Sequence, residues 1–288
     1  MKKLINLAFA SAAAVTATLI GLPASPASAA PSVSSLVEVS DNFPVVAGTE
    51  IRGTLNCPSG YRLVGAGGSA GGATTVFTAL TPTFDNTGAT MVGKLIELAP
   101  DPNQNRVHLE ITCAPADQFA DVITVETHDH RASPGVFSQG ISQCPAGYFA
   151  FGGGGYFSAG TRDVQGAASS NSTNSPSADG TAWTYAGVAP PGVRRALVTV
   201  TQCAPRTGRD FLVQFGNTST DGNRETSNFV DCPSGYTAIA GGFYASRPDG
   251  SLATPASAED SSGLGGRWFV RGFTPTNTKL VALAQCLR

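Results

Sequence analysis

Apolar and polar residues alternate over short runs through most of the chain, as in "VHLEITCAP" (107–115), "AWTYAGV" (182–188) and "ALVTVTQCAP" (196–205). Successive side chains of a β-strand point to opposite faces, so a period of two is typical of strands with one buried face. The apolar spacings of three and four that indicate an amphipathic helix are not sustained. Stretches rich in Gly, Ser, Asn and Asp, such as "FDNTG" and "SRPDG", separate the runs and predict turns. The pattern therefore predicts an all-β protein of short strands.

One phrase occurs three times at nearly equal intervals. It reads "NCPSGYRLVGAGG", "QCPAGYFAFGGGG" and "DCPSGYTAIAGGF", and its cysteines stand 87 and 88 residues apart. A second cysteine closes an apolar run later in each interval. We therefore predict three repeats, residues 30–117, 118–206 and 207–288, after a leader of residues 1–29.

Each repeat is expected to hold four strands. The first precedes the opening cysteine, the second begins at Tyr61, Tyr148 or Tyr236, the third surrounds a Trp or Met, and the fourth ends at the second cysteine. The distance from the Trp or Met to a following proline (Pro100, Pro190 or Pro275), and from that proline to the second cysteine, differs among the repeats by zero or two residues. An even change keeps the same side chains facing inward, which favours strands. The longest polar stretch, residues 169–180, is predicted to be a surface loop.

The strand that begins at each of these tyrosines carries almost no side chains on one face. Gly65 and Gly67, for example, follow Tyr61 at alternate positions. A strand tolerates such glycines where another backbone comes very close. Three copies could therefore meet on a pseudo-threefold axis, as in a β-prism of three sheets, one per repeat. The alternative is three β-sandwich modules in tandem.

The phrase Cys-Pro-x-Gly-Tyr-x-x-x-x-Gly-Gly, followed by a Trp and a strand that ends in Cys, resembles repeats of secreted actinobacterial proteins of unknown function. The chain is also similar, more faintly, to the β-prism of the vitelline membrane outer layer protein I family. That likeness implies binding of carbohydrate or matrix. It supplies no catalytic residue.

The first residues have the features of an export signal. Lys2 and Lys3 precede an apolar run that ends in "ASA" at residues 27–29, the arrangement of a secretory signal peptide. A transmembrane anchor is the less favoured alternative, and we expect a secreted, extracellular protein with no membrane anchor in its mature form. In an oxidising compartment, six cysteines indicate three disulfides. The repeat pattern favours the pairs Cys57–Cys113, Cys144–Cys203 and Cys232–Cys286.

Two small groups of side chains are candidates for a site. Glu126, His128 and His130 alternate along one segment, so on a strand they would share a face and could bind zinc or copper. The alternative is that this segment is a solvent-exposed edge strand, where alternating polar residues are ordinary and bind no metal. Trp183 and Trp268 could stack on sugar rings if they are exposed, or mark the core if they are buried.

Composition narrows the class of function. The formal net charge of −2 is weak and of the wrong sign for a nucleic-acid binder, and no catalytic or cofactor motif is found. We expect a monomeric, non-enzymatic binding protein directed to a glycan, the cell envelope or an extracellular protein. One alternative is a structural, protein-interaction or inhibitor scaffold. The other is an extracellular metal-dependent hydrolase that uses Glu126, His128 and His130.

Overall fold

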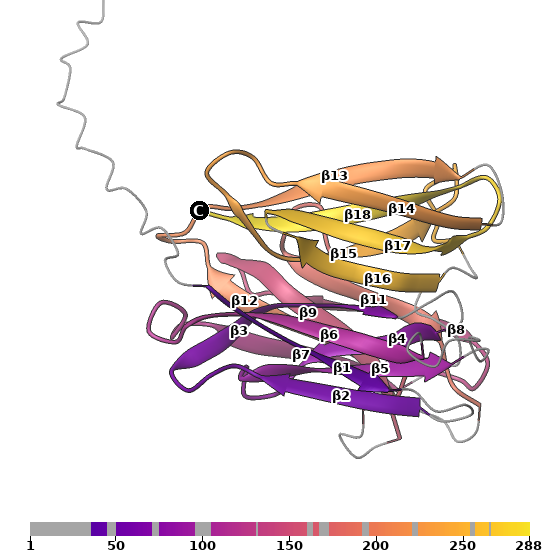
Figure 1. Cartoon of the computed structure of the whole chain (residues 1–288), viewed down its shortest axis with the longest axis horizontal. Helices are drawn as coiled ribbons and strands as arrows, with labels where there is room; N and C mark the ends of the chain where they lie inside the picture. The colour runs from indigo at the N-terminus through magenta and orange to yellow at the C-terminus, as the bar shows by residue number, and fades with distance from the viewer. Residues whose placement is uncertain are drawn as a thin grey trace, which may run out of the picture.

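The computed structural model describes residues 36–44, 50–70, 75–95, 105–130, 132–159, 164–166, 173–191, 196–220, 224–253, 257–264 and 266–288, so the leader lies outside the described residues. These residues form strands β1 to β18, six in each repeat (Figure 1). Within these ranges no helix is long and apolar enough to cross a membrane. The all-β prediction is confirmed.

The strands of the first repeat are β1 (Val37–Pro44), β2 (Glu50–Asn56), β3 (Tyr61–Ala70), β4 (Thr75–Pro82), β5 (Gly88–Leu95) and β6 (Arg106–Pro115). The second has β7 (Ile123–Asp129), β8 (Phe137–Gln143), β9 (Tyr148–Ser158), β10 (Thr173–Pro176), β11 (Ala182–Val188) and β12 (Ala196–Pro205). The third has β13 (Phe211–Thr220), β14 (Arg224–Asp231), β15 (Thr237–Ser246), β16 (Ser257–Leu264), β17 (Arg267–Thr274) and β18 (Thr278–Leu287).

The expectation of four strands in each repeat was too low. The two additional strands lie directly before the first cysteine (β2, β8, β14) and after the glycine-rich strand (β4, β10, β16). The predicted surface loop at residues 169–180 was also wrong in part, because Thr173–Pro176 forms the buried strand β10. This polar segment is a strand because it pairs with β11 on one side and β15 on the other. Residues 169–172 lie outside the described residues.

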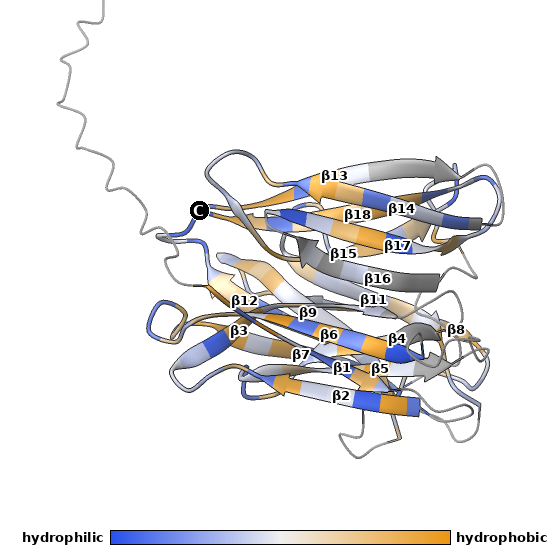
Figure 2. Cartoon of the chain, viewed as in Figure 1, coloured by the Kyte–Doolittle hydropathy of each residue, from blue (hydrophilic) through white to orange (hydrophobic). Residues whose placement is uncertain are grey.

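The strands form three six-stranded sheets. Sheet A has the order β1-β6-β3-β16-β17-β14, sheet B β2-β5-β4-β9-β12-β7, and sheet C β13-β18-β15-β10-β11-β8. Every sheet therefore joins half of one repeat to half of another. The prediction of one sheet per repeat was wrong, and the continuous sheets also contradict the alternative of separate tandem modules. Along individual strands apolar and polar residues alternate (Figure 2).

The three glycine-rich strands β3, β9 and β15 contact one another at the centre of the molecule. Each is involved in a β-bulge, where the register of its pairing shifts. The residues at these shifts, Val64, Phe151 and Ile239, are buried in one apolar cluster. A methyl group on Gly65 would overlap the carbonyl oxygen of Ile239. The predicted close backbone approach of these strands is therefore confirmed.

Three disulfides close the repeats, with the predicted pairing Cys57–Cys113, Cys144–Cys203 and Cys232–Cys286. Each joins the residue after β2, β8 or β14 to the final strand of the same repeat. In the chain-entropy model a loop of this length stabilises the fold by roughly 4 kcal/mol. The three disulfides also fit an extracellular setting.

Candidate functional site

The residues predicted as a metal site lie at the edge of sheet B. His128 Nε2 is 3.4 Å from Glu126 Oε2 on the edge strand β7. The imidazoles of His128 and His130 are stacked, with ring centroids 5.9 Å apart. Among the described residues, no group of three or more His, Cys, Asp or Glu side chains could hold a metal ion. The geometry therefore gives no support to the metal site or to the metal-dependent hydrolase.

The two tryptophans lie in the core. Trp183 and Trp268 are each only 2% exposed, and their indole nitrogens donate hydrogen bonds to Asn174 Oδ1 and Ser261 Oγ. Rings buried in this way cannot stack on a sugar, so these residues are core landmarks and not a ligand surface.

The strand register also shows that Ala89, and not Met91, is the residue of repeat 1 that matches the two tryptophans. The residue two before the opening cysteine pairs with Trp183 and Trp268 in repeats 2 and 3, but with Ala89 in repeat 1. Met91 instead occupies the place of Tyr185. Gly153 and Gly241 lie under the two indoles, and their counterpart Ala66 lies in the repeat with the smaller Ala89. In repeats 2 and 3 a glycine therefore makes room for each indole.

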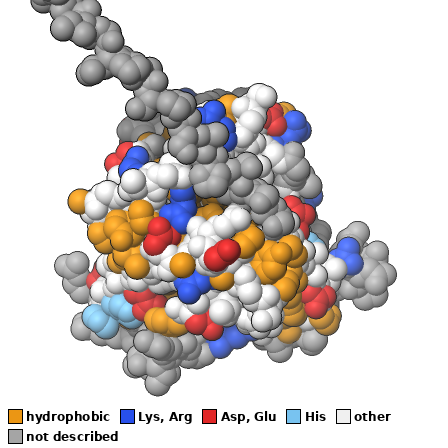
Figure 3. Space-filling model, turned by 90° about the vertical axis from the view of Figure 1, so that its left-hand side faces the viewer, with side chains coloured by type: hydrophobic (Ala, Val, Ile, Leu, Met, Phe, Trp, Pro, Cys, Tyr) orange, Lys and Arg blue, Asp and Glu red, His pale blue; other side chains and the backbone are white. Residues whose placement is uncertain are grey.

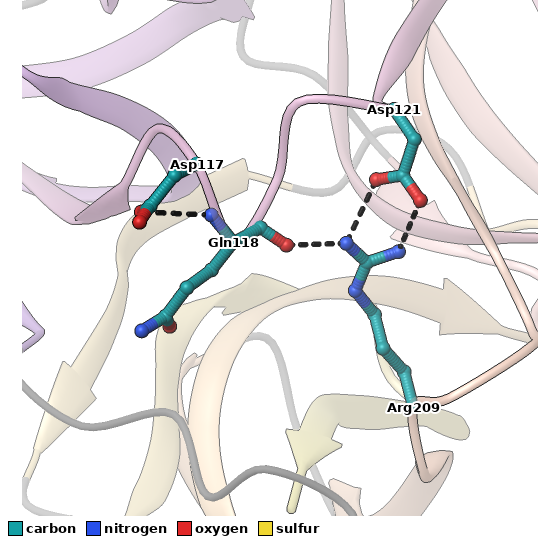
Figure 4. A network of polar contacts seen from close by, with 4 residues as sticks. All are labelled: Asp117, Gln118, Asp121 and Arg209. Carbon is teal, nitrogen blue, oxygen red and sulfur yellow. Dashed lines mark hydrogen bonds and ion pairs between the residues drawn. The ribbon is translucent and has the colours of Figure 1, made fainter.

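A pocket of about 200 Å³ lies where the two links between repeats meet the C-terminus. The guanidinium of Arg209 donates hydrogen bonds to both carboxylate oxygens of Asp121 and to the carbonyl of Gln118 (Figure 4). These bonds lower the pKa of the Asp121 carboxyl. Arg209 also lies 4.9 Å from the ring centre of Phe119. Because these charged groups are already paired, the cluster ties the two links together and is not the best candidate site.

The end of the molecule that carries the C-terminus is chemically mixed. Basic, acidic and apolar side chains lie beside one another on this face (Figure 3). An extended basic surface is the usual signature of nucleic-acid binding, and such a mixture does not provide one.

The best candidate site is a hollow on one face of sheet C, which we call the sheet C hollow. It measures about 280 Å³, and all six strands of the sheet contribute to it. The register places its side chains in neighbouring rows, because Phe215 pairs with Leu283, Tyr244 with Thr173, and Ser175 with Thr184. The lining residues are Gln139, Thr173, Ser175, Pro176, Ser177, Ala178, Thr184, Phe215, Tyr244, Gly250, Leu252 and Leu283.

The lining combines aromatic rings with hydroxyl and amide groups, and none of its described residues is charged. Phe215 is 45% exposed, so its ring is accessible to a ligand. Burial raises the pKa of the Tyr244 phenol, so its hydroxyl stays protonated and can donate as well as accept. Thr173 Oγ1 is buried and has no hydrogen-bond partner among the described residues. A ligand hydroxyl could supply that partner.

The matching face of sheet B differs at the positions of Thr173 and Tyr244. Ala79 stands there in the place of Thr173, and Tyr156 in the place of Tyr244. Tyr156 is 2% exposed and packs in an apolar cluster that Val164 covers. At these two positions sheet B is therefore covered, whereas sheet C has a hollow.

Sequence reasoning missed the sheet C hollow. Thr173 and Ser175 lay in the stretch predicted to be a loop, and Phe215 and Tyr244 are 29 residues apart on strands that are not neighbours in the sheet. The available signal was the difference between repeats at matching positions, such as Thr173 against Ala79.

No protein-family model matches this sequence, and a comparison with curated proteins gives no significant match.

Proposed function

We propose that this chain is a secreted, non-enzymatic glycan-binding protein of the extracellular space or cell envelope, and that the sheet C hollow is its site for a neutral polysaccharide. The observation that carries the proposal is the uncharged lining, in which Phe215 and Tyr244 lie beside hydroxyl and amide groups. The export signal of the sequence and the three disulfides support the location.

The chemistry of a neutral sugar fits this lining. A pyranose ring has an apolar C–H face, which packs against aromatic rings, and hydroxyl groups around its edge. The hydroxyls of Thr173, Ser175 and Thr184 and the amide of Gln139 can exchange hydrogen bonds with that edge. A charged ligand would find no opposite charge among these side chains.

The test is isothermal titration of the protein with soluble neutral polysaccharides: laminarin, mannan, xylan and dextrin. We expect at least one to bind, and Tyr244→Ala and Phe215→Ala to weaken that binding about tenfold or more. Thr173→Val should weaken binding while leaving stability unchanged or higher, because it removes a buried hydroxyl without a partner. That combination separates a ligand-binding role from a structural one.

Phe229→Ala is the matched control, because Phe229 is a similarly exposed phenylalanine (53%) on sheet A. It should leave glycan binding unchanged. The proposal is wrong if none of these polysaccharides binds, or if binding survives Tyr244→Ala and Phe215→Ala. An absence of glycan binding would favour the structural or protein-interaction scaffold.

A further inference from the structure

The three repeats meet along three equivalent contacts, which we call seam 1–2, seam 2–3 and seam 3–1. At seam 1–2, the side-chain amide of Gln202 donates hydrogen bonds to the carbonyl of Leu63 at 3.2 Å and to Asn86 Oδ1 at 3.1 Å. At seam 2–3, the amide of Gln285 donates to the carbonyl of Ala150. Both glutamines are fully buried. A carboxamide from one repeat thus fills each of these seams.

Seam 3–1 lacks this carboxamide. Gln202 and Gln285 each directly precede the second cysteine of their repeat, and the matching residue of repeat 1 is Thr112. Leu63 and Ala150 each lie two residues after the repeat's tyrosine, so the matching carbonyl belongs to Ala238. A threonine side chain carries no amide and is too short to replace one.

The hairpin beside this seam is also shorter. Six residues separate the paired positions Pro82–Ala89 and Pro176–Trp183. Only four separate the matching pair Gly263–Trp268. At seam 1–2 the longer turn supplies Asn86, whose side chain accepts hydrogen bonds from Gln202 and from Thr124 Oγ1. Two differences in sequence, Thr112 in place of a glutamine and the shorter hairpin, therefore both remove atoms from seam 3–1.

A pocket of about 480 Å³ lies at that place. Repeat 1 contributes its β1 and β6 walls, and repeat 3 contributes the start of β15 and the short β16–β17 hairpin. The lining is mostly polar, and its residues are Leu36, Glu38, Thr112, Tyr236, Thr237, Ala238, Gly263 and Gly266. Its volume falls in the range of small-ligand sites.

We propose that this pocket binds an N-acetylated sugar and that the ligand's acetamido group takes the place of the missing glutamine amide. At the other two seams, the matching position holds a side-chain amide. This amide donates a hydrogen bond to the carbonyl two residues after the tyrosine. An acetamido N–H can make the same bond to Ala238.

The remaining lining suits the rest of such a sugar. The pocket is much larger than one carboxamide, so it has room for the ring that carries it. The Glu38 carboxylate can accept hydrogen bonds from ring hydroxyls, and Thr112 and Thr237 can donate or accept. Leu36 and Ala238 are the two aliphatic side chains among the described lining residues, whereas the methylene stem of a peptide glutamine would need more apolar contact. These features favour a sugar over a peptide side chain.

The experiment is a calorimetric or NMR titration with the trimer of N-acetylglucosamine, compared with cellotriose, which has a hydroxyl in place of each acetamido group. The wild-type protein should bind the acetylated trimer at least about tenfold more tightly. Thr112→Gln restores the amide found at the other seams and should abolish this binding. Thr112→Ser keeps the pocket and should bind within about twofold of the wild type.

Thermal unfolding of Thr112→Gln establishes that the variant is folded, and its melting temperature should be equal or higher. Phe229→Ala, which lies outside the lining of both pockets, should leave binding of the acetylated trimer unchanged. Equal binding of the two trimers, no binding at millimolar concentration, or binding that survives Thr112→Gln would each overturn the proposal. Tighter binding of the tripeptide Gly-Gln-Gly than of the acetylated trimer would overturn the assignment to a sugar.

Discussion

Seam 1–2 and seam 3–1 have the same strands in the same order, yet one is closed and the other is open. At seam 1–2, Gln202, Asn86 and Thr124 form a hydrogen-bonded group across two repeats. At seam 3–1 the matching glutamine is Thr112, the hairpin is short, and a pocket remains. Residues that all three repeats share form the scaffold. The two pockets proposed as sites lie where one repeat has a different residue.

Sheets B and C show the same contrast on a broader surface. Ala79 and Tyr156 are buried and covered in sheet B, whereas Thr173 and Tyr244 line an open hollow in sheet C. A buried polar group without a partner reduces stability. Thr173 in sheet C is therefore costly for the fold alone, which is the reason to seek its role in binding.

The largest expected effect is a difference in stability between alanine substitutions of matching glycines at seam 3–1 and seam 1–2. A Cβ atom on Gly65, at seam 3–1, would overlap the backbone carbonyl of Ile239, whereas one on the matching Gly152 would meet chiefly the end of the Gln202 side chain. Gly65→Ala should therefore lower the free energy of unfolding by about 3 kcal/mol or more, and Gly152→Ala by about 1 kcal/mol. Urea denaturation of the two variants measures the difference, and equal effects would contradict the close approach at seam 3–1.

The next effect tests the turn that closes seam 1–2. Asn86 has φ of 57° and accepts two hydrogen bonds from the neighbouring repeat. Asn86→Ala should lower the free energy of unfolding by about 2–3 kcal/mol, the sum of backbone strain and lost bonds.

Asn277→Ala is the matched control in the same denaturation experiment. Asn277 has the same φ of 57° but is exposed in the turn between β17 and β18, so its replacement should show the strain alone, about 1 kcal/mol. A loss as large as that of Asn86→Ala would mean that the bonds across seam 1–2 contribute nothing.

The smallest effect concerns the acidic residues of the two longer hairpins. Hydrogen bonds from Thr87 and Thr83 lower the pKa of Asp85 below its ordinary value of 3.8, and bonds from Ser177 and Thr181 do the same for Asp179. A lowered pKa in the folded state contributes stability above the unfolded pKa, and this is lost as the pH falls through the folded value.

Asp85→Asn should therefore be less stable than the wild type at pH 7, and the difference should shrink below about pH 4. Because Asp85 is well exposed, we expect only a few tenths of a kcal/mol. Thermal unfolding at pH 7 and pH 3 measures it, and a difference that grows on acidification would contradict the assigned sign.

Much of the scaffold could be predicted from the sequence, because its main features recur in all three repeats. The equal spacing of the cysteines predicted the disulfides, and the bare glycine faces predicted the close approach of the three strands. The sharing of sheets between repeats could not be predicted, because the alternation along a strand does not encode which strand it pairs with. Thr173–Pro176 shows the same limit, since a short polar segment is a buried strand only through its two neighbours.

The candidate sites were less readable for a related reason. The histidines and tryptophans stood out by residue type. Among the described residues, however, no group of three or more His, Cys, Asp or Glu could hold a metal ion, and both tryptophans are buried. Thr112 and Thr173 are ordinary residues whose meaning appears only against Gln202 and Ala79 at matching positions. Recognising them required the register of the strands.

The most direct test of the account is a reciprocal exchange at the seams, Thr112→Gln and Gln202→Thr, followed by chemical denaturation of both variants. If an amide closes each seam, Thr112→Gln should raise the free energy of unfolding by about 1 kcal/mol. Gln202→Thr should lower it by about 2–3 kcal/mol, because it opens a cavity and leaves buried acceptors without donors. Opposite signs support the account. A loss of stability in Thr112→Gln as large as that in Gln202→Thr would contradict it.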